Sequence, residues 1–371
     1  MIIWAELEAA SVADVLDWAE GQPWARAMAA CGQDALWHAE GDVWTHTGLV
    51  VGELQRLPEW PGFDRATQLT LLLTALFHDA GKPATTALDP ETGRTRSPKH
   101  AVVGAELARS VLRELGCGLT LREAIAGLVR HHGRPPFLLE KPDPAREVIE
   151  LSWLTDTRLL HAFALADHRG RRAGDASRGE DDLHLGRMVA EENGCFGRPY
   201  PFANDHARFL FGRGELSSLG YTPREEYRGT VTLMAGLPGS GKDTWLQRHR
   251  PDLPVVSLDG LRGELAVGPT DDQGRVIQLA RERCREHLRA GRDFAFNATN
   301  TFRPTRQRWI DLFAEYGARV EIRYVEPAWP TVLRQNAARP VPVPRAVIER
   351  LAERLEPPTG LEAHAVELVG D

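Results

Sequence analysis

The run GLPGSGKDT at residues 236–244 limits the possible folds of this chain more than any other part of its sequence. It follows a β-rich apolar stretch, TVTLMA, and precedes a helical pattern near residues 242–250. A G-x-x-x-x-G-K loop between a strand and a helix turns backbone N–H groups around phosphate oxygens, and its lysine adds a positive charge. We therefore predict an α/β fold around a nucleoside triphosphate site. Its predicted residues are Gly236, Leu237, Pro238, Gly239, Ser240, Gly241, Lys242, Asp243 and Thr244.

The residue after the lysine departs from the usual form of this loop. That position is usually a Ser or Thr whose hydroxyl binds Mg²⁺. Here it is Asp243, and Thr244 follows it. The sequence leaves open which of these two side chains contacts the metal.

The second half of the chain, residues 229–371, alternates short apolar runs with helical segments. The apolar runs after the first are LPVVSLD, DFAFNATN and ARVEIRYVE. Buried strands that alternate with helices are typical of a parallel sheet covered on both faces. We therefore predict an α/β P-loop kinase domain over this range.

The first half, residues 1–190, has a helical pattern instead. Apolar residues recur at three- and four-residue spacing, for example in 66–77 and 101–115. Convincing alternating strands are absent before about residue 228, so we predict an all-α domain. Residues 191–228 are rich in Gly, Pro and aromatic residues, which is typical of a linker or docking segment. A chain of 371 residues is also too long for most single cores, which favours two domains.

Composition excludes several classes of protein. Apolar residues make up 42% and charged residues 26%, as in ordinary globular proteins, and no apolar run is long enough for a membrane span. The four cysteines are far apart and the start carries acids without a basic region, so we expect a cytoplasmic protein that does not act at membranes. The net charge of −7 argues against non-specific coating of DNA.

Polar side chains follow the predicted strands of the second half. Asp259 ends the run VVSLD, and Arg262 lies one helical turn later. Side chains at the carboxyl ends of parallel strands line the crevice where ligands bind. Asp259 can accept the proton of an attacking hydroxyl, and Arg262 can bind an acceptor phosphate. The structural alternative for Asp259 is a helix N-cap.

Arg334 and Arg339 lie in a helix that runs into a Pro-rich stretch. Arginines on a closing lid stabilise charge on a phosphoryl group in transfer. The alternative is an ordinary solvated helix face.

Four motifs together resemble the P-loop polynucleotide 5′-kinases over most of residues 230–358. They are GLPGSGKDTW, the D-x-x-R of Asp259 and Arg262, NATN, and RQNAAR followed by VP and LEPP. The resemblance implies transfer of the γ-phosphate of ATP, or another NTP, with Mg²⁺ to a 5′-hydroxyl of RNA or DNA. It implies that Asp259 is the general base and Arg262 the acceptor-phosphate contact. Lys242, Arg334 and Arg339 complete the catalytic set. Zeta-type toxins that phosphorylate sugar nucleotides share much of this pattern, so the acceptor stays open.

A second set of chemically active residues is centred on HDAGKP at residues 78–83. Adjacent His78 and Asp79 at a helix end can reach one divalent ion, and Gly81 and Pro83 end the helix. Further candidates are His46, His100, His131, His132 and Asp167, with His38 and His161 as minor ones. Imidazole and carboxylate ligands together favour Mn²⁺, Fe, Co²⁺, Ni²⁺ or Zn²⁺ over Mg²⁺ or Ca²⁺. Such an ion lowers the pKa of a water molecule and so supplies hydroxide for attack on phosphorus.

The order of these residues resembles the HD phosphohydrolase superfamily across about residues 37–172, most strongly the HD modules attached to tRNA nucleotidyltransferases. The resemblance implies one or two metal ions. The implied ligands are His46, His78, Asp79, His100, His132 and Asp167, with His132 favoured over His131. A substrate phosphate near the metal can be bound by Lys82, Arg169, Arg171 or Arg172. We include Lys82 among the catalytic residues, and Arg171 is the favoured arginine. An exposed basic loop is the alternative for the arginines.

The order of the two modules resembles the bacterial HD–Pnk family over nearly the whole chain. That resemblance implies an enzyme that heals nucleic-acid ends: it phosphorylates 5′-hydroxyls and hydrolyses 2′,3′-cyclic phosphate or phosphomonoester 3′ ends. A nucleotidyl-lysine motif is absent, so ligation would fall to a separate ligase. Two alternatives stay open. One is a nucleotide phosphohydrolase fused to a nucleoside or sugar-nucleotide kinase, and the other is a nucleotide-sensing protein without turnover.

Overall fold

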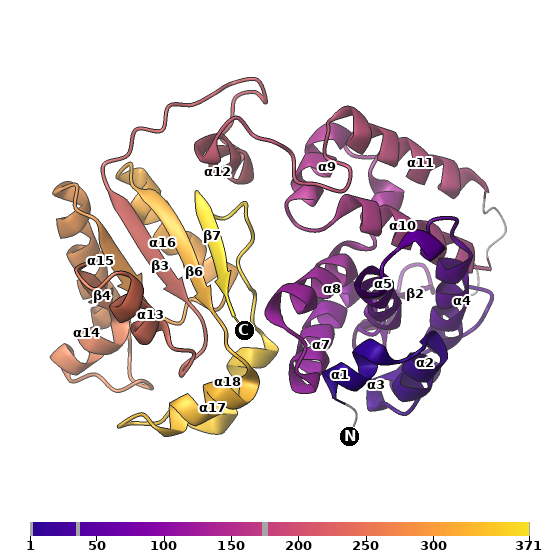
Figure 1. Cartoon of the computed structure of the whole chain (residues 1–371), viewed down its shortest axis with the longest axis horizontal. Coiled ribbons are helices and arrows are strands. Elements are labelled where there is room, and N and C mark those ends of the chain that lie inside the picture. The colour runs from indigo at the N-terminus through magenta and orange to yellow at the C-terminus, as the bar shows by residue number, and fades with distance from the viewer. Residues whose placement is uncertain (1–2, 35–37, 173–176, 371) are drawn as a thin grey trace. The chain divides into compact units, whose positions relative to one another are not determined.

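The computed structural model describes residues 3–34, 38–172 and 177–370, and it divides into two compact units (Figure 1). The first unit spans Met1–Pro201 and the second Phe202–Asp371. This division falls inside the segment 191–228 that the sequence marks as a linker. Each unit is described separately below.

The first unit is helical. Its helices are α1 (Trp4–Ala9), α2 (Val12–Glu20), α3 (Pro23–Ala29), α4 (Val43–Arg56), α5 (Arg65–Phe77), α6 (Lys82–Thr85), α7 (His100–Leu115), α8 (Leu119–His131), α9 (Pro144–Ser152), α10 (Thr157–Gly170) and α11 (Ser177–Glu192), with 3₁₀ turns η1 (Trp60–Gly62) and η2 (Pro135–Phe137). A short antiparallel hairpin, β1 (Ala87–Leu88) with β2 (Thr95–Arg96), corrects the expectation that no strand precedes residue 228. Strands of two residues are too short to show an alternating pattern.

Helix α5 forms the centre of this unit. Every residue from Leu69 to Phe77 is buried. Asp64 caps the helix by accepting the backbone N–H of Thr67, which satisfies one of the free donors at the N-terminus. Helix α10 packs against α4, α5 and α11, and α8 packs against α5 and α7. This arrangement places the C-terminal end of α5, with His78 and Asp79, inside the bundle.

The second unit is an α/β domain, as predicted. Its strands are β3 (Thr230–Ala235), β4 (Val255–Ser257), β5 (Phe294–Asn297), β6 (Arg319–Val325) and β7 (Ala365–Val369). They form one parallel sheet in the order β4-β5-β3-β6-β7. Its helices are α12 (Asp205–Arg213), α13 (Lys242–His249), α14 (Leu258–Leu265), α15 (Gly274–Arg289), α16 (Arg303–Glu315), α17 (Trp329–Ala337) and α18 (Arg345–Glu353).

The register of the sheet places the polar strand ends side by side. Asn297 on β5 pairs with Met234 on β3 and with Ser257 on β4. The side chain of Asn300 donates to the carbonyl of Met234 at 2.8 Å, and Gly236 N–H donates to the carbonyl of Thr299 at 2.8 Å. The NATN segment is therefore attached directly to the start of the glycine-rich loop.

Strand β7 is the one strand of this sheet that the sequence did not indicate. It is short and lies at the edge, and Glu367 and Leu368 on it are exposed. A half-exposed edge strand lacks the continuous apolar run that marks the buried strands. None of the helices in the described ranges is both long and apolar enough to span a bilayer.

A buried ion pair joins α16 to the last part of the chain. The guanidinium of Arg306 on α16 makes a two-pronged contact with Glu362, at 2.8 and 3.0 Å. Both side chains are fully buried, and Arg306 also donates to the carbonyls of Asn300 and Glu356. The pair therefore positions the NATN segment against the segment after α18.

We expect Arg306→Ala to lower the free energy of unfolding by about 3–5 kcal/mol, because it leaves Glu362 charged and unpaired inside the domain. Chemical denaturation of the purified chain measures this loss. The double variant Arg306→Met with Glu362→Leu serves as the control, since removing both charges costs much less than removing one. Equal losses in the single and double variants would contradict this account.

Candidate active sites

The predicted metal ligands of the first unit come from five helices. His46 lies on α4, His78 is the C-cap of α5 with Asp79 directly after it, and His100 begins α7. His132 is the C-cap of α8, and Asp167 lies on α10. Five of the six are fully buried, and His100 is half-buried. The bundle therefore gathers in its interior residues that are up to 121 positions apart.

These six residues form two groups, each with three candidate ligand atoms within 4.8 Å of one another. His46, His78 and Asp167 make the first group; Asp79, His100 and His132 make the second. The groups adjoin, because His78 Nε2 lies 3.2 Å from Asp79 Oδ2 and 3.9 Å from Asp167 Oδ1. His131, the open alternative to His132, belongs to neither group. The geometry therefore favours His132 and has room for two ions.

Three of the histidines are held in the same tautomer. Nδ1 of His78, His100 and His132 each lies 2.8 Å from the carbonyl oxygen three residues earlier. A carbonyl only accepts hydrogen bonds, so each Nδ1 carries a proton and donates. Each neutral ring therefore presents the lone pair of Nε2 to the centre, which is the form that binds metals.

Two of those lone pairs face each other. His100 Nε2 and His132 Nε2 are 3.3 Å apart, and both lie within 3.9 Å of Asp79 Oδ1. Burial lowers the pKa of His132 to about 3, so its Nε2 remains unprotonated. The Nε2 of His78 is buried and has no hydrogen-bond partner among the described residues. A divalent cation in each of the two groups would satisfy these nitrogen and oxygen atoms, so the residues present fit a metal centre.

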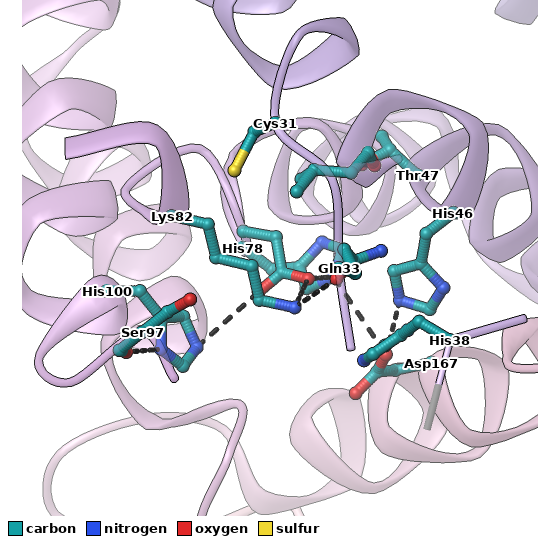
Figure 2. Close-up of polar contacts among 12 residues, drawn as sticks. Cys31, Gln33, His38, His46, Thr47, His78, Lys82, Ser97, His100 and Asp167 are labelled. Atoms are coloured by element: carbon teal, nitrogen blue, oxygen red, sulfur yellow. Dashed lines mark hydrogen bonds and ion pairs between the residues drawn. The ribbon is translucent and has the colours of Figure 1, made fainter. Parts of the chain in front are cut away.

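Two basic side chains contact the carboxylates of this centre. Lys82 Nζ lies 2.6 Å from Asp79 Oδ2, and Arg171 Nη2 lies 2.5 Å from Asp167 Oδ2. Burial alone would raise the pKa of Asp79, but the positive charge of Lys82 and contacts with His78 hold it well below its usual range. Figure 2 shows Lys82 reaching to Gln33 across the centre, where their side chains are 2.6 Å apart. Both cations are thus placed to meet a substrate phosphate beside the metal ligands.

Arg169 and Arg172, the other two arginines of the loop, make different contacts. Arg169 Nε donates to the carboxylate of Glu180 at 3.1 Å. Arg172 is exposed, and its backbone N–H donates to Glu40. Arg171 is therefore the one of the three that the structure brings to the metal ligands.

Sequence reasoning missed Glu40. Its Oε1 lies 2.8 Å from Nδ1 of His38 and 2.9 Å from Nδ1 of His46. The other ring nitrogen of His46 lies 3.0 Å from Asp167 Oδ1 (Figure 2). Burial disfavours the charged ring, but these carboxylates outweigh it and raise the pKa of His46 to about 9. Glu40 therefore holds His46 with Nε2 toward Asp167, as carboxylates behind metal-binding histidines do.

Glu40 and Gln33 precede the recognisable motif, and no spacing rule indicates them. His38, a minor candidate, contacts Glu40 and not the central carboxylates. His161, the other minor candidate, lies elsewhere, in a small apolar cavity with Leu138 and Phe196.

We expect Glu40→Ala to weaken metal binding by about 10–100-fold, because His46 loses the group that orients it. Titration of the metal-free protein with Mn²⁺ or Zn²⁺ measures the affinity. Glu59→Ala, which removes an exposed glutamate of the same unit, is the matched control. An unchanged affinity in Glu40→Ala would show that Glu40 does not orient His46.

The glycine-rich loop of the second unit surrounds a buried lysine. Lys242 begins α13, and its Nζ donates to the carbonyls of Gly236 and Leu237, both at 2.9 Å. Burial lowers the pKa of Lys242 to about 8, while Asp243 and Asp259 oppose that shift. Gly236 has φ +142°, and a Cβ there would lie 2.3 Å from the carbonyl oxygen of Val325. The tight loop thus requires glycine at this point.

Asp259 lies in the first turn of α14. Ser257, not Asp259, caps that helix, by accepting the backbone N–H of Gly260. The structure therefore does not adopt the N-cap alternative. The Asp259 side chain is 70% exposed, which leaves it accessible to a substrate hydroxyl.

Two arginines contact Asp259. Arg262 donates to one carboxylate oxygen, and Arg339 Nη2 lies 3.4 Å from the other. Gln273 fixes Arg262 by accepting its Nε–H at 2.8 Å. The charge of Asp259 raises the pKa of Lys242 and that of Arg339 lowers it, so both side chains lie near the glycine-rich loop.

The structure does not place Arg334 in this group. Arg334 is exposed, and its Nη2 donates to Thr331 on its own helix at 3.1 Å. The neighbouring Asn336 is buried instead and holds the Pro-rich segment through both backbone groups of Val343. A Cβ at Gly239 would lie 2.8 Å from the carbonyl of Val332, so α17 packs closely on the loop.

Comparisons with known proteins match each half separately. Residues 43–154 match the HD domain family, and residues 231–358 match an AAA domain family. A CC-adding tRNA nucleotidyltransferase of Thermus thermophilus is 47% identical over 95 residues, 23% of this chain and 22% of that protein. An A-adding tRNA nucleotidyltransferase of Deinococcus radiodurans is 45% identical over 65 residues, 17% of this chain and 15% of that protein.

The chain therefore spans about a fifth of the length of these curated relatives, and the matches fall in the HD region. A solved structure described as a "putative kinase" from Chloroflexus aurantiacus aligns with 39% of this chain and 86% of its own, at 14% identity and a TM-score of 0.32. The chain thus combines a helical domain that matches the HD family with an α/β domain that carries the glycine-rich loop, matches an AAA domain family and is built on a five-stranded parallel sheet.

Proposed function

We propose that this protein heals nucleic-acid ends, as a polynucleotide 5′-hydroxyl kinase and a 2′,3′-cyclic phosphodiesterase or phosphatase of the HD–Pnk type. The observation that supports the proposal is the presence, on one chain, of a glycine-rich loop near an accessible carboxylate and of a cluster of candidate metal ligands whose carboxylates contact two basic side chains. Broken RNA with a 5′-hydroxyl and a cyclic phosphate needs a phosphate added at one end and a phosphate ester opened at the other. Ligation is then the task of a separate ligase.

In the kinase half, the loop amides and Lys242 hold the β- and γ-phosphates of an NTP. Asp259 takes the proton of the 5′-hydroxyl as that oxygen forms a bond to the γ-phosphorus. The bond from this phosphorus to the bridging oxygen breaks, and the NDP leaves. Arg339 stabilises the charge on the phosphoryl oxygens, and Arg262 binds a phosphate of the acceptor strand. We retain Arg334 as a lid residue that reaches the phosphates only if α17 moves.

In the HD half, His46, His78, Asp79, His100, His132 and Asp167 would hold one or two transition-metal ions. A bound divalent ion supplies Lewis acidity and acidifies water there. Lys82 and Arg171 bind the phosphate oxygens of the cyclic diester and orient it. Water adds to phosphorus, one ester P–O bond breaks, and the proton passes to the leaving ribose oxygen.

The test uses a labelled RNA with a 5′-hydroxyl and a 2′,3′-cyclic phosphate, incubated with ATP, Mg²⁺ and Mn²⁺. The proposal expects both ends to be converted. Parallel reactions contain free nucleosides, sugar nucleotides or free nucleotides. Turnover of those compounds alone would favour a small-molecule kinase fused to a nucleotide phosphohydrolase, and tight ATP binding without any turnover would favour a sensor.

A further inference from the structure

We propose that Asp243, held in place by Asn297, is the metal-binding side chain of the nucleotide loop and makes nucleotide binding dependent on a divalent cation. This inference rests on the proposed nucleotide site at residues 236–244. It selects between Asp243 and Thr244, which the sequence leaves open. It also assigns a role to Asn297.

The contact between Asp243 and Asn297 is the first step. Asn297 Nδ2 donates to Asp243 Oδ1 at 2.7 Å. A carboxylate only accepts hydrogen bonds, so the orientation of the Asn297 amide is determined chemically. Oδ2 of Asp243 takes no part in that bond.

The second step is that Asn297 cannot move easily. It is 5% exposed and ends β5, paired in register with both neighbouring strands. Three residues later, Asn300 is bonded to the carbonyl of Met234 on the strand that leads into the loop. Asp243 is exposed by itself, so its hydrogen bond to the sheet is what restricts its position.

The third step is the chemistry of the donors. A loop of this type usually presents a neutral hydroxyl to Mg²⁺ at this position. A carboxylate is a stronger ligand for the hard Mg²⁺ ion, and carboxylate and amide oxygens are the ligands that Mg²⁺ prefers. The residues present therefore fit the ion that accompanies an NTP.

The fourth step is electrostatic. A carboxylate beside the triphosphate repels ATP that carries no metal, whereas a hydroxyl does not. Two like charges about 4 Å apart at a protein surface change affinity by about tenfold or more. Mg²⁺ between them converts this repulsion into attraction. The loop should therefore discriminate strongly against metal-free nucleotide.

The experiment measures the Kd of ATP by calorimetry on the full chain, once with Mg²⁺ and once with EDTA. We expect the wild type to bind Mg·ATP at least about a hundredfold more tightly than metal-free ATP. Asp243→Asn keeps the shape and the hydrogen bond but removes the charge. It should bind metal-free ATP about tenfold more tightly than the wild type and Mg·ATP less tightly.

Two further variants separate a metal role from a purely structural one. Asn297→Ala keeps the charge but frees the side chain, so it should weaken Mg·ATP binding about threefold to tenfold without strengthening binding of metal-free ATP. Thr244→Ala should leave the ratio of the two affinities unchanged. Opposite shifts of the two Kd values in Asp243→Asn cannot arise from a loop that is merely damaged.

The outcomes separate this inference from the function on which it rests. A wild type that binds Mg·ATP and metal-free ATP equally would overturn the role of Asp243 and leave the nucleotide site intact. Loss of the Mg²⁺ dependence of ATP binding in Thr244→Ala, and not in Asp243→Asn, would do the same. A wild type that binds no ATP even with Mg²⁺ would overturn the proposed nucleotide site, and this inference with it.

Discussion

Lys242→Ala will abolish phosphorylation of 5′-hydroxyl ends and leave 3′-end processing unchanged. Lys242 is buried within the loop, and its Nζ donates hydrogen bonds to the carbonyls of Gly236 and Leu237. In the proposed reaction this cation would face the transferred phosphoryl group, where negative charge is redistributed. Removal of one preorganised cation of this kind lowers the rate by about 10²–10³-fold or more.

The measurement is transfer of labelled γ-phosphate from ATP to a 5′-hydroxyl oligonucleotide. Arg248→Ala, which removes an exposed cation from the same helix, should retain the wild-type rate. Loss of cyclic-phosphate hydrolysis in Lys242→Ala would show that the two sites are not independent. Retention of kinase activity would remove Lys242 from the catalytic set.

Asp79→Ala will produce the converse phenotype, with no 3′-end processing and normal 5′ phosphorylation. Asp79 lies between the two groups of candidate ligands: its two oxygens lie near His78, Lys82, His100 and His132. Without it, the second group of ligands loses its only carboxylate. We expect metal content to fall and hydrolysis to drop by about 10³-fold or more, as for loss of an activating metal.

Metal analysis of the purified variant and hydrolysis of a 2′,3′-cyclic phosphate RNA test this expectation. Thermal unfolding checks that the variant is folded, since Asp79 is buried and charged. Glu91→Gln, at an exposed position of the hairpin, is the control for loss of a negative charge. Full metal content and activity in Asp79→Ala would contradict the proposed centre.

Local patterns explain why so much of the second unit could be predicted. Its buried strands are continuous apolar runs, and the glycine-rich loop between β3 and α13 is a recognisable local motif. Positions Lys242, Asp259 and Arg262 follow from this pattern because the carboxyl ends of parallel strands meet at one edge. Strand β7 was not predicted because Glu367 and Leu368 are exposed, so the strand lacks a continuous apolar run.

The residues that cluster in the first unit as candidate metal ligands could also be proposed from the sequence, but for a different reason. Each stands in a short motif at a helix end, and His78-Asp79 followed by Gly81 is informative alone. Glu40 stands in no such motif, and the NATN motif that contains Asn297 does not indicate the contact of Asn297 with Asp243. Each of these two residues contacts a neighbour distant in the chain, and no local pattern records such a contact.

The amino-acid order alone determines that this chain has a mainly helical part and a parallel α/β part. It also determines which residue types are available for phosphate and metal chemistry. Both follow from the sequence because helix and strand periodicities and the glycine-rich loop are local properties. Only the tertiary structure brings His132 and not His131 into the cluster, separates the candidate ligands into two groups, joins Asp243 to Asn297 and leaves Arg334 away from Asp259. Those outcomes depend on distances of a few ångströms between residues far apart in the chain, and such distances are set by the packing of whole helices and strands.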